Sequence, residues 1–228
     1  MANILVVVTN VSKYQGVERA TGLWLGEAVH FVAEMEKEGH RVDYVSPEGG
    51  YTPIDPHSLE KDQMTELDWK YYQNKDFKNK LGTTLAAGDI NPEDYDVIYY
   101  TGGHGVMWDY PDNEKLQKIA MKIYENGGIV SAVCHGAIGL INIKNDAGEH
   151  LILNKKVTGF ANSEEIAIGL DKVVPYLTED ELVKSGADYV KGNDWASFAV
   201  VDGHIVTGQN PASGGEVAKE VIKLLSLK

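Results

Sequence analysis

The chain has 228 residues, of which 43% are apolar and 24% are charged, a composition that is typical of a folded globular protein and excludes intrinsic disorder. Its formal net charge of −13 disfavours nucleic acid and anionic membrane surfaces as partners, because neither would find a basic stripe to bind. One cysteine cannot form an internal disulfide, and neither a leader segment nor a membrane-spanning run is evident, so we expect a cytoplasmic protein.

The first part of the sequence predicts a β-α-β unit. The apolar run at 4–9 is typical of the central strand of a parallel sheet. Apolar residues recur at helical spacing between 23 and 37, and Gly39 ends that helix. A second strand is expected at 42–45. This succession predicts a right-handed crossover between two parallel strands.

The segment 49–94 has a looser pattern than its surroundings. Three prolines interrupt a polar stretch that carries short helical pieces near 59–69 and 76–81. A plain connection in a compact domain is much shorter than this segment. We therefore expect an inserted cap that covers the edge of the sheet.

A glycine-rich turn follows the next buried strand. The strand at 97–100 leads directly into Thr101-Gly102-Gly103-His104-Gly105, where the chain can approach a ligand closely and offer N–H groups. An amphipathic helix is expected at 111–125. A short apolar run at 129–133, behind a glycine pair, predicts another strand buried on both faces.

The rest of the sequence predicts further strands and helices around the same sheet. A strand-like segment is expected at 151–158 around an Asn154-Lys155 turn. Helices are expected at 164–170, 178–185 and 211–225, and a hairpin of 198–201 with 205–207 around Asp202-Gly203. The sum is a single α/β domain over 1–228. We expect a doubly wound, mostly parallel sheet with helices on both faces, a flavodoxin-like three-layer sandwich with a small cap insertion.

The only cysteine of the chain stands between a predicted strand and a predicted helix. Ala132 lies two residues before Cys134 and Gly136 two residues after it. This is the spacing of a nucleophile elbow, a tight turn whose strained backbone needs small neighbours. At a helix N-terminus the thiol pKa is expected to fall below its usual value of about 8.5. The alternative is a buried structural cysteine, which is common but belongs in the middle of a strand.

Several groups that can assist a thiol are expected at the same edge of the sheet. An imidazole of His135 or His104 can take the thiol proton and relay it. Glu27, an acid among apolar neighbours on its helix, is expected to be half buried and protonated beside the sulfur, unless it is a solvated helix charge. The backbone N–H groups of Gly103 and His135 can form an oxyanion hole.

Metal binding is the weaker interpretation of the histidines. Glu27 and His30 share one helical face, but no second pair stands at ligand spacing, so we expect no obligatory metal and no cofactor. Aromatic and polar residues near the predicted site are candidates for the substrate pocket, although aromatic residues in such loops more often serve packing. These candidates are Trp24, His104, Trp108, Trp195 and Asn210.

Four motifs in this order resemble the ThiJ/PfpI superfamily over nearly the whole chain. They are Glu27-Ala28-Val29-His30, Gly103-His104-Gly105 followed by Asp109-Tyr110-Pro111, Ala132-Val133-Cys134-His135-Gly136, and Gly208-Gln209-Asn210-Pro211-Ala212-Ser213. The branch that the chain is most similar to contains heat-inducible chaperones and glutathione-independent glyoxalases, the glyoxalase III enzymes. The resemblance implies Cys134 as nucleophile, His135 as proton relay and Glu27 as the carboxyl group that tunes the thiol.

The resemblance also implies an activity and an assembly. It implies an enzyme that converts methylglyoxal and other 2-oxoaldehydes to D-lactate and other 2-hydroxy acids without glutathione, and a homodimer. The alternatives are a stress-response holdase, a redox sensor, a protein deglycase or, less favoured, a cysteine peptidase. A glutamine amidotransferase is excluded, because neither His150 nor His204 has a carboxylate two residues later.

Overall fold

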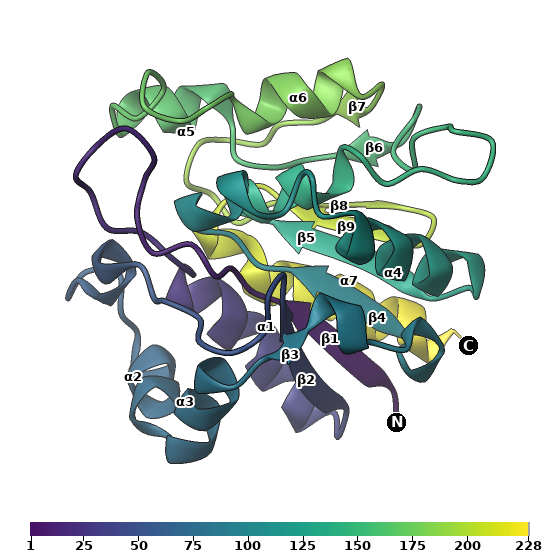
Figure 1. The fold of residues 1–228 in the computed structure, drawn as a ribbon, viewed down its shortest axis with the longest axis horizontal. Helices are drawn as coiled ribbons and strands as arrows, with labels where there is room; N and C mark the ends of the chain where they lie inside the picture. The colour runs from purple at the N-terminus through teal and green to yellow at the C-terminus, as the bar shows by residue number, and fades with distance from the viewer. Residues whose placement is uncertain (228) are drawn as a thin grey trace.

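The computed structural model describes residues 1–227, and its centre is one seven-stranded sheet. The strand order is β3-β2-β1-β4-β5-β9-β8 (Figure 1). Every neighbouring pair is parallel except the hairpin of β8 and β9. The strands are β1 (Asn3–Val7), β2 (Arg41–Ser46), β3 (Leu85–Ala86), β4 (Val97–Tyr100), β5 (Ile129–Val133), β8 (Ala199–Asp202) and β9 (Ile205–Gly208). The mostly parallel sheet confirms the predicted α/β class.

Helices cover both faces of this sheet. The α-helices are α1 (Leu25–Lys37), α2 (Glu66–Gln73), α3 (Lys75–Gly82), α4 (Glu114–Glu125), α5 (Asn162–Ala167), α6 (Thr178–Lys184) and α7 (Gly214–Ser226). Apolar side chains of α1 and α7 pack on one face with Ile4 and Val6, and those of α4 pack on the other with Leu5 and Val7. Successive side chains of strand β1 point to opposite faces of the sheet. Because helices cover both faces, side chains on both sides of the strand are buried. None of the helices described is both long and apolar enough to cross a bilayer.

The segment 49–94 adds both helices and a strand to the fold. Its short 3-10 helix η1 (Pro56–Leu59) precedes α2 and α3, which lie together at the lower left of Figure 1. The segment then contributes β3, which pairs with β2 in parallel register and forms the sheet edge. This edge strand was not expected, because two residues are too few to show a strand pattern in the sequence.

Two expected elements are shorter or start later in the structure. Of the predicted strand at 151–158 only β6 (Lys156–Val157) forms, and it pairs with β7 (Asp188–Tyr189) in a separate small sheet. Tight turns occupy 151–154, so the strand does not form before the predicted turn, whereas the turn itself is present, with Asn154 in a left-handed conformation. The helix predicted from 111 begins at Glu114, since the side chain of Asn113 caps it by accepting a hydrogen bond from the Leu116 N–H.

Candidate active site

Cys134 sits where β5 ends and the 3-10 helix η5 (Cys134–Leu140) begins. Its backbone φ is +57°, a left-handed conformation that a residue with a side chain adopts only under strain. This is the strained turn that the spacing of small residues predicts. The predicted helix that follows is a 3-10 helix. The thiol lies at the carboxyl edge of the sheet and is almost completely buried, with a residue exposure of 2%.

Gly136 shows why the turn needs a small residue. A Cβ atom at Gly136 would lie 2.4 Å from the Tyr100 carbonyl oxygen and 2.5 Å from that of Thr101. Both obstacles are backbone atoms of the strand β4 and its end, which cannot move aside cheaply. The turn after Cys134 therefore packs against β4 at a separation that only glycine allows.

We expect the substitution Gly136→Ala to lower the free energy of unfolding by about 3 kcal/mol, because the added methyl group forces the turn away from β4. The matched control is Gly215→Ala in α7, where an added Cβ meets nothing within 4 Å. That change should stabilise the protein by about 0.5 to 1 kcal/mol. Urea unfolding of both variants measures the difference. Equal stability of the two variants would contradict the proposed tight contact.

His135 connects the thiol to a carboxylate. Its Nδ1 lies 3.4 Å from the Cys134 Sγ, and its Nε2 lies 2.6 Å from the Glu165 Oε2. A carboxylate only accepts hydrogen bonds, so Nε2 must carry a proton and donate it to Glu165. In the neutral ring Nδ1 is then the unprotonated nitrogen, and it faces the sulfur. The ring is thereby oriented to accept the thiol proton.

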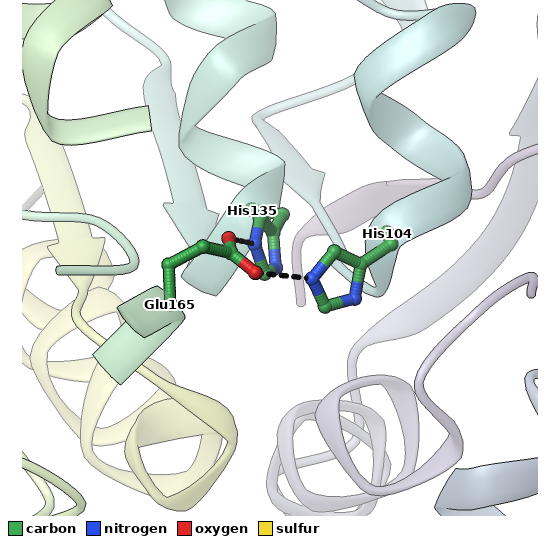
Figure 2. A group of neighbouring side chains, drawn as sticks. All are labelled: His104, His135 and Glu165. Carbon is green, nitrogen blue, oxygen red and sulfur yellow. Dashed lines mark hydrogen bonds and ion pairs between the residues drawn. The ribbon is translucent and has the colours of Figure 1, made fainter. Parts of the chain in front are cut away.

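Glu165 lies between two imidazoles, as Figure 2 shows. Its other oxygen, Oε1, lies 2.7 Å from Nε2 of His104. Burial acts to raise the pKa of Glu165, but the electrostatic attraction of His135 and the hydrogen bonds from both rings outweigh it and hold that pKa below its ordinary value. Burial and then the neighbouring His135 lower the pKa of His104 to about 4. At neutral pH, His104 is thus an uncharged donor to a charged carboxylate.

Glu27 approaches the sulfur from the helix α1. Its side chain is fully buried, and its Oε2 accepts a hydrogen bond of 2.7 Å from the Gly102 N–H. Its other oxygen, Oε1, is buried without a hydrogen-bond partner among the described residues. Burial raises the pKa of Glu27 to about 8, and its interactions with Cys134 and the Gly102 N–H oppose this only in part. A carboxyl group that is protonated at neutral pH can donate a hydrogen bond to a thiolate, as the sequence predicts for Glu27.

The raised pKa of Glu27 makes the stability of the protein dependent on pH. Between the unfolded pKa of about 4.5 and the folded value of about 8 the native state alone keeps the proton, so stability falls as pH rises through this range. Glu27→Gln removes this dependence. We expect the free energy of unfolding of the variant, measured relative to that of the wild type, to rise by about 2 to 4 kcal/mol from pH 5 to pH 9.

Chemical denaturation across this pH range measures the effect of Glu27→Gln. The control is Glu38→Gln, which changes an exposed acid at the end of α1 and should follow the wild type at every pH. A wild-type curve that runs parallel to that of Glu27→Gln from pH 5 to pH 9 would show that Glu27 is ionised in the native state.

The expectation of a lowered thiol pKa is wrong for this arrangement. Burial raises the pKa of Cys134 well above its ordinary value, and the His135 backbone N–H opposes this only in part. The reason is that desolvation of a buried thiolate outweighs a helix start of a few residues. Cys134 is therefore a thiol at rest, and its ionisation depends on a neighbouring base.

The thiol borders a cavity of about 480 Å³. Its walls come from the sheet edge, from 57–63 within the segment 49–94, and from the chain between β5 and η6 (Pro211–Ser213). The lining residues are Trp24, His57, Glu60, Gln63, Gly103, His104, Cys134, His135, Phe160, Ile168, Trp195, Asn210, Pro211 and Ala212.

Most of the predicted pocket residues border this cavity, but Trp108 does not. Trp24, His104, Trp195 and Asn210 are part of its lining. The Trp108 ring instead packs edge-to-face on Tyr14, with 5.3 Å between ring centroids. Trp108 lies at the end of the 3-10 helix η4 (His104–Trp108), and the Tyr14 ring packs against both Trp108 and His104.

One group of three metal-ligating side chains stands out among residues 1–227. The ligand atoms of His104, His135 and Glu165 lie within 4.8 Å of one another. Their mutual hydrogen bonds account for this closeness, since both Nε2 atoms already donate to the carboxylate. The pair Glu27 and His30 does not form a site: Glu27 faces the sulfur, whereas the His30 Nε2 lies 3.2 Å from Asp68 on α2.

Glu165 is the residue of this site that the sequence analysis did not identify. It lies 30 residues after His135, in a stretch that the sequence shows only as the acidic start of a helix. Acidic residues are common in the first turn of a helix, where the helix dipole stabilises their negative charge and their side chains usually face solvent. The nearby apolar pair Phe160-Ala161 is the only local sign that this helix start is buried.

A protein with this sheet, this strained cysteine turn and this cavity has the architecture of the DJ-1/PfpI class. The family model for the DJ-1/PfpI family matches residues 20–224, and the chain belongs to this family. The match covers every residue of the site described above. The predicted ThiJ/PfpI resemblance is confirmed.

Several relatives that match over most of their length carry the name glyoxalase, and one is a Rapid Encystment Protein. The chain is 38% identical to "Glutathione-independent glyoxalase HSP31" of Saccharomyces cerevisiae, covering 90% of each chain. It is similar to the structure of glyoxalase III of Candida albicans, with a TM-score of 0.90, 34% identity and coverage of 98% of this chain and 97% of that one. The structure of Rapid Encystment Protein 24 KDa of Francisella tularensis matches with a TM-score of 0.95, 37% identity and 99% coverage of both chains.

Proposed function

We propose that the protein is a glutathione-independent glyoxalase of the glyoxalase III type, which converts methylglyoxal and related 2-oxoaldehydes to D-lactate and the corresponding 2-hydroxy acids. The observation that carries this proposal is the chain of contacts from the Cys134 thiol through His135 to Glu165, at 3.4 Å and 2.6 Å. It lies at the wall of a cavity large enough for such a substrate. The names of the relatives support the same reaction.

The reaction begins with attack of the sulfur on the aldehyde carbon. His135 Nδ1 accepts the thiol proton as the carbon–sulfur bond forms, so no resting thiolate is needed. Negative charge develops on the aldehyde oxygen, and we assign its stabilisation to the backbone N–H groups of Gly103 and His135. The protonated imidazole is stabilised by Glu165 and returns its proton to this oxygen. The product is a hemithioacetal on Cys134.

The second stage moves a hydrogen from one substrate carbon to the next. His135 removes the proton of the former aldehyde carbon, and protonation of the adjacent carbonyl oxygen gives an enediol. A proton then returns to the second carbon while the hydroxyl group on the sulfur-bearing carbon loses its proton, which yields a thioester of the 2-hydroxy acid. Water then cleaves the carbon–sulfur bond and regenerates the thiol. The sum is addition of one water molecule to the 2-oxoaldehyde, with no external oxidant or reductant.

The test is to incubate the purified protein with methylglyoxal, without glutathione, and to follow the loss of substrate together with D-lactate by a stereospecific enzymatic assay. We expect one D-lactate for each methylglyoxal consumed. Loss of methylglyoxal without any lactate would indicate adduct formation on lysine or arginine side chains, and would sink the proposal.

Two of the other interpretations, the redox sensor and the cysteine peptidase, fit the site less well. A redox sensor needs an accessible thiol of low pKa, whereas Cys134 is buried and its pKa is raised. A cysteine peptidase needs an open groove for a polypeptide, whereas 57–63 within the segment 49–94 form part of the cavity wall. Both features support a small substrate.

We also infer that the protein works as a homodimer in the cytoplasm. The cytoplasmic location is supported by the single reduced cysteine, which an oxidising compartment would endanger. The dimer is supported by the family resemblance alone. Light scattering after size-exclusion chromatography should give a mass of twice the 25.0 kDa chain, and a mass of one chain would contradict the dimer.

A further inference from the structure

The cavity is much larger than the substrate named above requires. Its volume is about 480 Å³, within the range of sites that enclose drug-sized ligands. Methylglyoxal is a three-carbon molecule, and a water molecule takes about 30 Å³ of liquid volume. With methylglyoxal bound at the sulfur, most of the cavity remains free for a larger group. The residues that line this free space indicate the chemistry of that group.

One wall of the cavity is apolar and aromatic. The Phe160 ring packs on His135, with 4.3 Å between ring centroids, and Trp195 packs edge-to-face on Phe160 at 5.9 Å. Ile168 also lines this wall. The aromatic row thus begins at the ring that contacts the sulfur and ends at Trp195. An apolar group attached to the reacting carbons would lie along this row.

Trp195 is held in place at a cost in backbone strain. It is the outermost ring of the row and 47% exposed, although it belongs to the cavity lining. Its φ of +63° is a left-handed conformation, rare for a bulky residue. The backbone N–H of Trp195 donates a hydrogen bond of 2.8 Å to the Oε1 of the buried Glu164. The side-chain amide of Asn210 donates to the same oxygen, also at 2.8 Å. Strained residues with such anchoring are characteristic of ligand sites.

We propose that Trp195 is a specificity-determining residue that packs against the apolar or aromatic substituent of 2-oxoaldehydes larger than methylglyoxal. This inference rests on the proposed function, since it names the substrate class of the same site. In the free protein the exposed part of the indole ring remains in contact with water. When substrate is bound, this apolar surface packs against the substituent and is removed from water. Binding energy from this remote contact then lowers the barrier at the sulfur. Arylglyoxals, of which phenylglyoxal is the simplest, fit this description.

The test compares phenylglyoxal with methylglyoxal. In the wild type we expect a higher kcat/KM for phenylglyoxal. Trp195→Ala should lower kcat/KM for phenylglyoxal roughly tenfold and that for methylglyoxal by a smaller factor, and Trp195→Phe should restore most of the loss. The matched control is Trp69→Ala, which removes a tryptophan of similar exposure, 42%, from α2 outside the cavity lining. An unchanged ratio of the two kcat/KM values in Trp195→Ala would overturn the inference.

Binding of the product acids separates this inference from the proposed function. Calorimetric titration should show that mandelate, the acid formed from phenylglyoxal, binds the wild type more tightly than lactate. Trp195→Ala should abolish this difference. If the protein turns over neither aldehyde but still prefers mandelate through Trp195, the proposed reaction fails and the assigned contact stands. If Trp195→Ala leaves the preference for mandelate intact, the assigned contact is wrong.

Discussion

Cys134→Ala is expected to abolish conversion of methylglyoxal to lactate, with kcat falling at least roughly 10³-fold. No other thiol is available to form the hemithioacetal, since Cys134 is the only cysteine of the chain. Cys134→Ser should lose nearly as much. Its hydroxyl group fits the same turn, but it is far less acidic and less nucleophilic than a thiol. The rate of D-lactate formation measures both effects.

The same variants separate a chemical role of Cys134 from a structural one. The thiol fills a small part of the core, so both variants should unfold within a few degrees of the wild type. Alkylation with iodoacetamide, followed by mass spectrometry, should add one group to the wild type and none to Cys134→Ala. If the protein is instead a holdase that acts through its surface, suppression of client aggregation will persist in Cys134→Ala. Lactate formation at the wild-type rate in Cys134→Ala would refute the mechanism.

Replacement of the carboxylate between the two imidazoles is expected to have the next largest effect. Glu165→Gln should lower kcat/KM roughly 10³-fold. The glutamine oxygen can accept a hydrogen bond from only one ring, and its amide group turns a donor toward the Nε2 of the other. His135 then loses the partner that fixes its tautomer and stabilises its charged form, so Nδ1 no longer faces the sulfur as a ready base.

A pH profile distinguishes this role of Glu165 from a loss of folding. The wild-type alkylation rate of Cys134 reports how readily the buried thiol ionises, and in Glu165→Gln we expect it to need a higher pH. Glu165→Asp keeps the charge and should recover part of the activity. Glu114→Gln serves as the control, because that side chain is 79% exposed at the start of α4. A Glu165→Gln enzyme with a wild-type rate and pH profile would remove Glu165 from the mechanism.

The sequence alone determined the frame of this protein and the centre of its site. Buried strands show as apolar runs and α1 as a helical repeat, because burial on one or both faces imposes a period on the chain. The small residues around Cys134 revealed the strained turn, since the close approach of Gly136 to β4 excludes any side chain there. Glu27 was identifiable as an acid among apolar neighbours.

Only the tertiary structure decided which groups meet and how they ionise. Glu165 reaches His135 from a helix 30 residues away, and no local pattern records a contact across such a distance. Whether a thiol pKa rises or falls depends on how much water the fold removes, so the burial of Cys134 reversed a prediction based on its position at a helix start. The spacing of apolar residues along the sequence indicates which face of a helix or strand is buried. Desolvation and contacts between distant residues arise only when the chain is folded, so the sequence pattern does not show them.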